Sequence, residues 1–128
     1  MYSHKKVLLV DDDAEINFPI LIMILEKIGF KKENISIAKD GIDALDVLKI
    51  NQVDLIITDF VMPRMDGMEL IKAVKNDKQF FRKPIILNSG TPNSFLVQQA
   101  IKFGASGFFP KPYNREKIEI EIKKAFPS

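Results

Sequence analysis

Short apolar runs of strand-forming residues alternate five times with segments of helical periodicity along this chain of 128 residues. In the helical segments, apolar residues recur every three or four positions, whereas the strand-like runs are continuously apolar. Continuous apolar strands that alternate with helices favour a parallel sheet with both faces covered. We therefore predict a doubly wound α/β domain with a five-stranded parallel sheet flanked by five helices. The predicted strands are Lys6–Val10, Ile35–Ala38, Asp54–Thr58, Pro84–Asn88 and Gly107–Phe109.

The composition limits the class of protein. Hydrophobic residues make up 46% and charged residues 28% of the chain, as in a globular domain with one core. The lack of cysteine excludes disulfides and thiolate zinc sites and fits a reducing compartment, so we expect a cytoplasmic location. The longest apolar stretch, Phe18–Leu25, is too short to span a membrane, and we expect no signal peptide. A net charge of only +2 with scattered lysines disfavours nucleic acid as a partner.

Polar and charged side chains follow four of the predicted strands. Asp11 and Asp12 come after the first strand, Asp59 after the third, Ser89 after the fourth and Lys111 after the fifth. In an open parallel sheet, ligands bind at the carboxyl ends of the strands. Each residue alone has a simpler explanation, such as a helix cap, a turn or a solvated lysine. Polar or charged residues occur at the carboxyl ends of four strands, which makes coincidence a poor explanation. We therefore expect these side chains to converge on one edge of the sheet.

This set of side chains suits phosphoryl transfer. Clustered carboxylate oxygens favour a hard divalent cation, and Mg²⁺ takes one or two carboxylates together with phosphate oxygens and waters. Mg²⁺ and Lys111 would supply the positive charge that Asp11 and Asp12 require. Asp59 lies alone at the centre of the edge and is the candidate nucleophile, because carboxylates can accept a phosphoryl group covalently. Lys111 and the Ser89 hydroxyl would then contact the phosphoryl oxygens.

Four features of the sequence resemble the receiver domain of two-component response regulators, in particular the stand-alone chemotaxis regulators. They are "VLLVDDD", "DLIITDFVMPRMDG", the hydroxyl residue Ser89 and "GASGFFPKP". The resemblance implies a flavodoxin-like strand order of 2-1-3-4-5. It implies that Asp59 is phosphorylated by a sensor histidine kinase or a histidine phosphotransfer protein. It also implies that Asp12, Asp59 and the backbone carbonyl of Val61 bind Mg²⁺, with Asp11 acting mainly through water.

The same resemblance implies how the signal is transmitted. Lys111 would pair with Asp59 or its phosphate through a cis peptide bond to Pro112, and Ser89 and Phe108 would act as the switch. Phe108 lacks the hydroxyl that many family members carry at this position. A downstream protein would bind the surface formed by the fourth helix, the last strand and the fifth helix. The domain would be a monomer or a phosphorylation-dependent dimer, and would catalyse transfer only to and from its own Asp59.

Three residues bear on the helix and strand assignments. Pro19 lies within the expected first helix, where it removes a hydrogen bond, so we expect a delayed start near Asn17 or a kink. Pro110 ends the last predicted strand and requires that strand to be at an edge of the sheet. Ile120 lies about 200° around the fifth helix from Ile118, so we expect it on the exposed side.

Other interpretations fit less well. A flavin-binding module would need a hydroxyl- and glycine-rich phosphate loop where the acidic run stands. A haloacid-dehalogenase-type phosphatase would share Asp11-x-Asp13, but Ala14 and Glu15 depart from its motif and the chain has no room for a cap. A receiver that no longer accepts phosphate is disfavoured because every key residue is present. Asp13 is equally well explained as a helix N-cap.

The sequence ends at Ser128, directly after the fifth predicted helix. We therefore expect residues 1–128 to form a single receiver domain without an output domain. The same ending would also result if the chain were a segment of a longer regulator or of a hybrid kinase, and the sequence does not separate the two.

Overall fold

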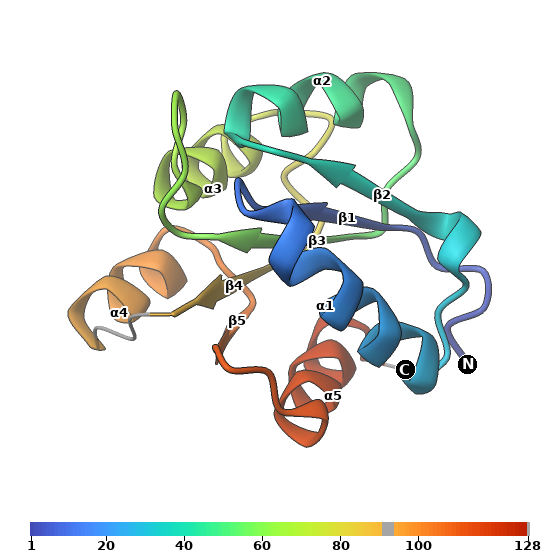
Figure 1. The fold of residues 1–128 in the computed structure, drawn as a ribbon. Helices are drawn as coiled ribbons and strands as arrows, with labels where there is room; N and C mark the ends of the chain where they lie inside the picture. The colour runs from blue at the N-terminus through green and yellow to red at the C-terminus, as the bar shows by residue number, and fades with distance from the viewer. Residues whose placement is uncertain (91–93, 128) are drawn as a thin grey trace.

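The computed structural model describes residues 1–90 and 94–127, which form one parallel sheet covered by helices (Figure 1). The strand order is β2-β1-β3-β4-β5 and every neighbouring pair is parallel, which confirms the predicted doubly wound, flavodoxin-like fold. The strands are β1 (Val7–Val10), β2 (Ile35–Ala38), β3 (Leu55–Asp59), β4 (Ile85–Ser89) and β5 (Gly107–Pro110). The helices are α1 (Ala14–Ile28), α2 (Gly41–Ile50), α3 (Gly67–Lys75), α4 (Ser94–Lys102) and α5 (Arg115–Ala125), with a short 3₁₀ helix η1 (Lys32–Asn34) before β2.

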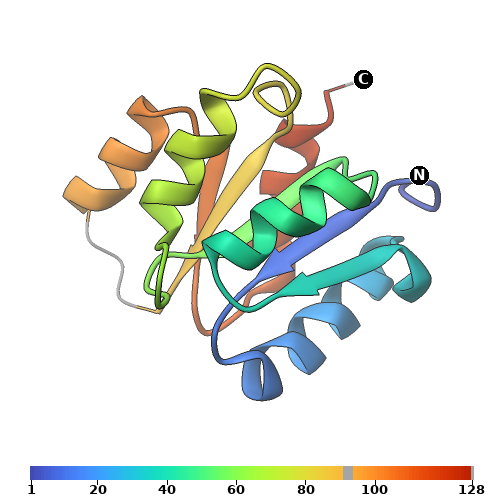
Figure 2. The same cartoon turned by 90° about the horizontal axis from the view of Figure 1, so that it is seen from above.

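The helices form two layers. α1 and α5 cover one face of the sheet, and α2, α3 and α4 cover the other (Figures 1 and 2). Successive strand residues point to opposite faces, so Val7 and Leu9 of β1 pack on the α1 and α5 side and Leu8 and Val10 on the other. Burial on both faces explains why the strands are continuously apolar. We name the two sets of buried side chains the α1–α5 core, which includes Leu9, Leu25, Ile57 and Ile122, and the α2–α4 core, which includes Leu8, Leu48, Ile56 and Ile71.

The bounds of β2 are as predicted, and those of the other four strands differ from the predicted ones by one residue. β1 begins one residue later than predicted, β3 and β4 are shifted by one residue toward the C-terminus, and β5 ends one residue later. Asp59 and Ser89 are therefore the last residues of their strands, not the first residues after them. Pro110 lies opposite Ser89 on β5. Because β5 is an edge strand, the missing N–H of Pro110 is tolerated there, as expected.

The start of α1 also differs from the prediction. The helix begins at Ala14 and not near Asn17, and Pro19 lies inside it. The backbone N–H of Asn17 donates to the carbonyl oxygen of Asp13 at 3.0 Å and starts the helix, while the Asn17 side chain contacts Asp11. Pro19 removes one backbone hydrogen bond, and burial of an apolar helix face offsets this loss. That face consists of Phe18, Leu21 and Leu25.

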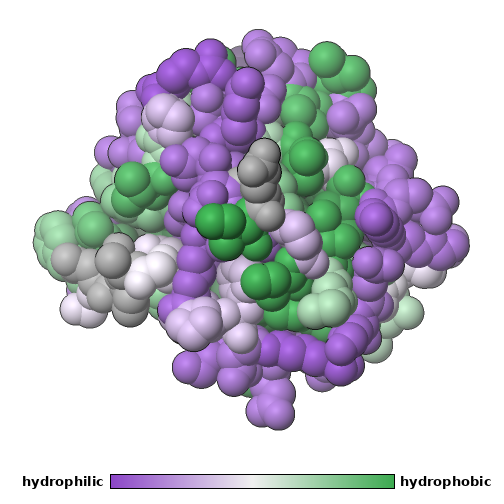
Figure 3. Space-filling view, viewed as in Figure 1, coloured by the Kyte–Doolittle hydropathy of each residue, from purple (hydrophilic) through white to green (hydrophobic). Residues whose placement is uncertain are grey.

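The outer side of α1 is unusually apolar for an exposed helix face. Residues 16–25 include no charged side chain. Ile16, Ile20 and Met23 are 63%, 47% and 51% exposed, at the spacing of a stripe along one side of the helix. Figure 3 shows apolar side chains gathered over the region of α1. None of the helices in the described part of the chain combines the length and the hydropathy of a membrane span.

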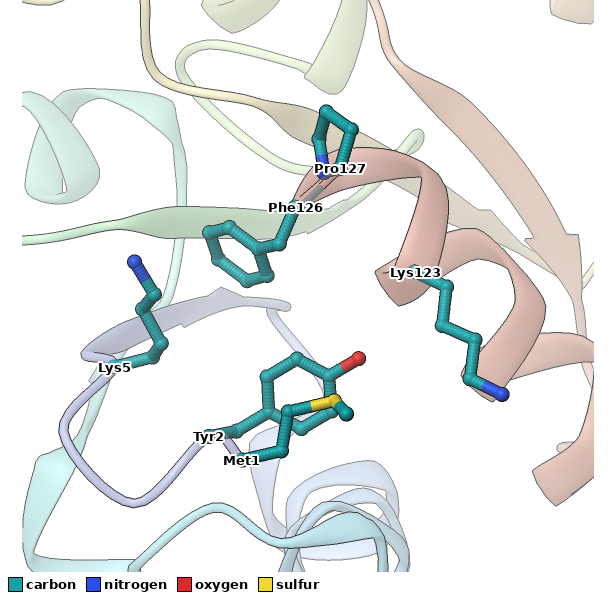
Figure 4. A pocket seen from close by; sticks show the side chains of 6 residues that line it. All are labelled: Met1, Tyr2, Lys5, Lys123, Phe126 and Pro127. Atoms are coloured by element: carbon teal, nitrogen blue, oxygen red, sulfur yellow. The ribbon is translucent and has the colours of Figure 1, made fainter.

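The N-terminal segment packs against the end of α5, at the amino-terminal ends of the strands (Figure 1). The Tyr2 ring stacks on Phe30 with centroids 4.9 Å apart and lies 6.0 Å from the Phe126 ring. Tyr2 and Phe126 line a pocket of about 550 Å³. Figure 4 shows Lys5 and Lys123 on opposite sides of these two rings. Both ends of the described chain therefore lie away from the edge of the sheet that carries the acidic residues.

Candidate functional site

Three carboxylates lie together at the carboxyl edge of the sheet. Asp11 and Asp12 follow β1, and Asp59 ends the neighbouring strand β3. One carboxylate oxygen from each residue lies within 4.8 Å of those of the other two. Asp11 and Asp59 are 2% and 8% exposed, whereas Asp12 is open to solvent. Three converging oxygen ligands, two of them shielded from water, fit a hard divalent cation.

Lys111 places a positive charge in this acidic pocket. Its ammonium nitrogen lies 3.2 Å from Asp11 Oδ2 and 3.5 Å from Asp59 Oδ2. Lys111 directly follows β5, and its backbone N–H donates to the carbonyl oxygen of Ser89 at 2.9 Å. The peptide bond between Lys111 and Pro112 is cis, as the resemblance implied. The structure therefore brings together the lysine and the carboxylates that the strand ends had indicated.

The pKa values of Asp59 and Lys111 are both shifted in this pocket. Burial raises the pKa of the Asp59 carboxyl, and the charge of Asp11 adds to this, although Lys111 acts in the opposite direction. Burial lowers the pKa of Lys111, but Asp59 and Asp11 outweigh this effect, so its pKa is raised and the ammonium stays charged at neutral pH. One ammonium against three carboxylates leaves the pocket negative, which favours the binding of a further cation.

Asp11 is held by donors on three sides. Its Oδ1 accepts from the backbone N–H of Asp13 at 2.8 Å, and its Oδ2 accepts from Asn17 Nδ2 at 3.0 Å and from Lys111. Asp13 occupies the N-cap position of α1, but its side chain makes no capping bond to the described part of the helix. The contact of Asn17 with Asp11 was not predicted, because Asn17 was expected only near the start of the helix and α1 begins three residues earlier.

The loop after Asp59 stays close to the pocket. The backbone N–H of Phe60 donates to Asp59 Oδ1 at 2.8 Å, and the N–H of Gly67 donates to the Phe60 carbonyl at 2.8 Å. A Cβ atom at Gly67 would collide with the carbonyl oxygen of Asp59 and lie 3.0 Å from Phe60 Cα, so glycine is required there. Val61 lies on this loop with its side chain 65% exposed.

An ion pair fastens the same loop to α2. Asp40 is 2% exposed and caps α2 by accepting the backbone N–H of Asp43 at 2.8 Å. It also accepts from Arg64 Nε at 2.7 Å and from Nη2 at 3.0 Å. The Arg64 guanidinium holds the pKa of Asp40 below its usual range. The N–H of Gly41 donates to the carbonyl of Met65 at 3.0 Å and adds a second link.

The two predicted switch residues lie on neighbouring strands. Ser89 is 6% exposed at the end of β4, and Phe108 of β5 is half-buried against the α2–α4 core. Phe108, Pro110 and Ile120 also contribute to a shallow hollow of about 290 Å³ between β5 and α5. Ile120 is 54% exposed and Ile118 is fully buried, as their spacing around the helix predicted.

Comparison with known proteins defines the family. A family model of the response regulator receiver domain matches residues 7–123, so the chain belongs to this family, which serves in two-component systems. The transcriptional regulatory protein CpxR of Escherichia coli K12 is 33% identical over 118 residues, which are 92% of this chain and 47% of CpxR. The chain thus spans about half the length of the curated relatives it matches.

Solved structures of the family share the fold. The chemotaxis response regulator CheY4 of Vibrio cholerae superimposes with a TM-score of 0.81 at 30% identity, over 95% of this chain and 98% of CheY4. The receiver domain of a histidine kinase from Syntrophus aciditrophicus has a TM-score of 0.81 at 27% identity, over 94% of this chain and 89% of that one. Receiver domains interact with histidine kinases and downstream targets, and bind a divalent metal at an acidic pocket, formed here by Asp11, Asp12 and Asp59.

Proposed function

We propose that Asp59 accepts a phosphoryl group from the phosphohistidine of a sensor histidine kinase or of a histidine phosphotransfer protein, in a Mg²⁺-dependent reaction. The observation that carries this proposal is the Lys111 ammonium between the carboxylates of Asp11 and Asp59. Phe60 orients one oxygen of Asp59 through its backbone N–H, and the other oxygen faces Lys111. The Asp59 carboxylate is therefore fixed beside the positive charge of Lys111, which would stabilise the phosphorylated form.

The proposed reaction exchanges one bond to phosphorus for another. An oxygen of Asp59 forms a bond to phosphorus while the P–N bond of the phosphohistidine breaks, and the imidazole keeps the electron pair and takes up a proton. Lys111 would contact one phosphoryl oxygen, and the Ser89 hydroxyl would donate to another. Attack of water on phosphorus then releases phosphate and restores the carboxylate. The domain thus acts as a signalling switch that catalyses transfer only to and from its own Asp59.

Four groups of this chain would hold the metal. Asp12, Asp59 and the backbone carbonyl of Val61 would bind Mg²⁺ directly, and Asp11 would act mainly through water. Bound Mg²⁺ would offset the charge of the phosphoryl oxygens. Support comes from the spacing of the three carboxylates, and from the solvent exposure of Asp12, which leaves the ion an entry path.

The exposed apolar stripe of α1 supports a docking surface for the phosphoryl donor. A donor histidine must reach Asp59, so its protein has to contact elements that adjoin the acidic pocket. α1 starts three residues after Asp11 and presents Ile16, Ile20 and Met23 to solvent. Apolar groups at such a surface favour a protein partner. We therefore assign the first contact with the donor to α1.

The output surface is assigned to α4, β5 and α5. Movement of the Ser89 hydroxyl toward the phosphate would open space that Phe108 can occupy, which would alter the hollow beside Ile120. A downstream protein would bind there, to a monomer or to a phosphorylation-dependent dimer. We propose that this receiver domain acts in the cytoplasm.

Intact-mass measurement tests the acceptor. The protein would be incubated with phosphoramidate and Mg²⁺, with and without a chelator. We expect one phosphate adduct in the wild type, no adduct with the chelator, and no adduct in Asp59→Asn. An adduct that persists in Asp59→Asn, or that forms equally well with the chelator, would remove Asp59 or the metal from the proposed reaction.

A further inference from the structure

A buried amide lies directly beside the proposed phosphorylation site. Asn88 is 2% exposed, and its register partners are Asp59 on β3 and Phe109 on β5. Strand alternation directs the Asn88 side chain to the same face as Ile86, which packs in the α1–α5 core. A buried amide is unfavourable on an apolar face unless its polar atoms are hydrogen-bonded, so its partners are informative.

Only half of this amide is satisfied. Asn88 Nδ2 donates to the hydroxyl oxygen of Tyr113 at 3.1 Å. Asn88 Oδ1 is buried and has no hydrogen-bond partner among the described residues. The Tyr113 ring packs edge-on against Phe109, with centroids 6.1 Å apart. A leucine at position 88 has no polar atom that could be left unpaired. The hydrogen bond to Tyr113 is therefore what an asparagine provides at this position and a leucine does not.

This bond fixes the segment that carries Lys111. Tyr113 stands two residues after Lys111, and the backbone N–H of Lys111 donates to the carbonyl of Ser89 at 2.9 Å. Adjacent residues of β4, Asn88 and Ser89, thus hold the segment 111–113 at two points. The Lys111 ammonium extends from this segment to Asp11 and Asp59.

The Tyr113 hydroxyl also lies within the field of the acidic pocket. Burial raises the pKa of Tyr113, the bond from Asn88 and the charge of Lys111 oppose the rise, and Asp11 and Asp59 add to it. The hydroxyl therefore stays neutral at physiological pH and keeps its own proton while it accepts from Asn88. It can hold the segment without adding charge to the pocket.

We propose that Asn88 and Tyr113 form a positioning pair that sets the reach of Lys111 into the acidic pocket. The pair does not contact the phosphoryl group, and acts by keeping the segment 111–113 against β4. This inference rests on the proposed function, because a fixed Lys111 matters for stabilising a phosphoryl group on Asp59. Loss of either partner should therefore slow phosphorylation without preventing it.

Three variants test the pair by labelling with phosphoramidate and Mg²⁺. Tyr113→Phe removes only the hydroxyl and keeps the ring on Phe109, and Asn88→Leu removes the amide at similar volume. Each single change should slow labelling about fivefold, as expected for one lost hydrogen bond, and the double variant should be no slower than either. Tyr2→Phe, which alters the other tyrosine of the chain at the far end of the sheet, should label like the wild type.

Wild-type labelling rates in Tyr113→Phe, or single effects that add in the double variant, would overturn the inference. A second measurement needs neither metal nor phosphoryl donor: the ¹⁵N resonance of the Lys111 ammonium and the side-chain amide resonances of Asn88. Tyr113→Phe should shift both, and unchanged Lys111 resonances would overturn the positioning role even where labelling falls. If the wild type takes no label while these resonances shift as expected, the proposed function fails and the structural link between the pair and Lys111 stands.

Discussion

The Arg64 guanidinium holds the buried Asp40 carboxylate with two hydrogen bonds, of 2.7 and 3.0 Å, between the β3–α3 loop and the start of α2. The same carboxylate caps α2, so one side chain fixes both a helix and the loop that leads from Asp59. The Arg64 side chain is 55% exposed and the Asp40 side chain 3%, so a largely solvated cation neutralises a buried anion.

Arg64→Gln should lower the free energy of unfolding at neutral pH, because Asp40 then remains buried without its cation. The hydrogen bonds from Arg64 hold the folded-state pKa of Asp40 below its ordinary value. The stabilisation is therefore present above that ordinary value and is lost as the pH falls through the folded-state pKa. The difference in urea midpoint between wild type and variant should be largest near neutral pH and should shrink in acid.

Arg115→Gln is the matched control for this experiment. Arg115 lies on the surface of α5, 3.8 Å from Glu119, and such an exposed pair contributes little to stability. We expect a small midpoint difference at every pH. A difference for Arg64→Gln that does not change with pH would show that the link to Asp40 titration is wrong.

Gly67→Ala should destabilise the fold by about 1–3 kcal/mol, the usual effect of overpacking a tight contact. The reason is the collision of a Cβ atom with the Asp59 carbonyl oxygen. Gly90→Ala is the control, since among the described residues a Cβ atom there would meet only Lys111 Cδ at 3.7 Å and Cβ at 4.0 Å. Urea denaturation followed by circular dichroism suits a chain without tryptophan. Equal midpoints for the two variants would contradict the assignment of a steric role to Gly67.

Asp12→Ala should weaken Mg²⁺ binding about tenfold or more, because Asp12 is a proposed direct ligand. Loss of a residue that only hydrogen-bonds to a metal ligand already lowers metal affinity about tenfold. Asp13→Ala should have a small effect, since Asp13 lies at the start of α1 and outside the cluster of three carboxylates. Calorimetric titration with Mg²⁺ measures both affinities. Equal losses in the two variants would mean that the acidic run binds metal in a different register.

The Ser89→Ala variant should still accept phosphate on Asp59, but little of the resulting conformational change should reach Phe108 and Ile120. The hydroxyl would donate to a phosphoryl oxygen, and Phe108 on the next strand would respond through a shift between two existing states. The measurement is an amide shift map with Mg²⁺ and beryllofluoride. Wild-type changes should extend to Phe108 and Ile120, and the variant's changes should stop near the acidic pocket. The same extent in both proteins would exclude this coupling route.

Ile20→Glu should slow phosphoryl transfer from a histidine phosphotransfer protein while leaving labelling by phosphoramidate unchanged. The charge would disrupt the apolar surface of α1 without entering the pocket, because Ile20 is 47% exposed. Ile50→Glu is the control, at an 83% exposed position at the end of α2. If both variants slow transfer equally, or if labelling by phosphoramidate falls with Ile20→Glu, α1 is not the docking surface.

Periodicity and strand ends were sufficient to predict the sheet, its helices and the residues that meet at its edge. The carboxyl ends of parallel strands share one edge, so the sequence positions of Asp11, Asp59 and Lys111 determine that they approach one another. Of the two alternatives for Pro19, a delayed start of α1 or a kink, the delayed start was wrong because the effect of Pro19 was overestimated. One lost hydrogen bond weighed less than the burial of Phe18 and its apolar neighbours.

Polar pairs remote in sequence could not be predicted. Asn88 and Tyr113 are separated by 25 residues, and Arg64 and Asp40 by 24. No sequence motif with a fixed spacing marks either pair, because the contact between the two side chains depends on the path of a loop between secondary-structure elements. Asn17 was considered only as a helix start, and its contact with Asp11 follows from a helix that begins earlier than its proline suggests.

The arrangement of the chain ends has a practical consequence for assays in living cells. Met1 and Pro127 lie together beside the pocket between Tyr2 and Phe126, at the opposite end of the strands from Asp59 (Figures 1 and 4). A fluorescent protein joined at either end would therefore leave the path of an incoming phosphohistidine open. Two such reporters, one at each end, would sit too close together to register the switch by energy transfer, so a sensor needs its second probe inserted on the side of β5 and α5.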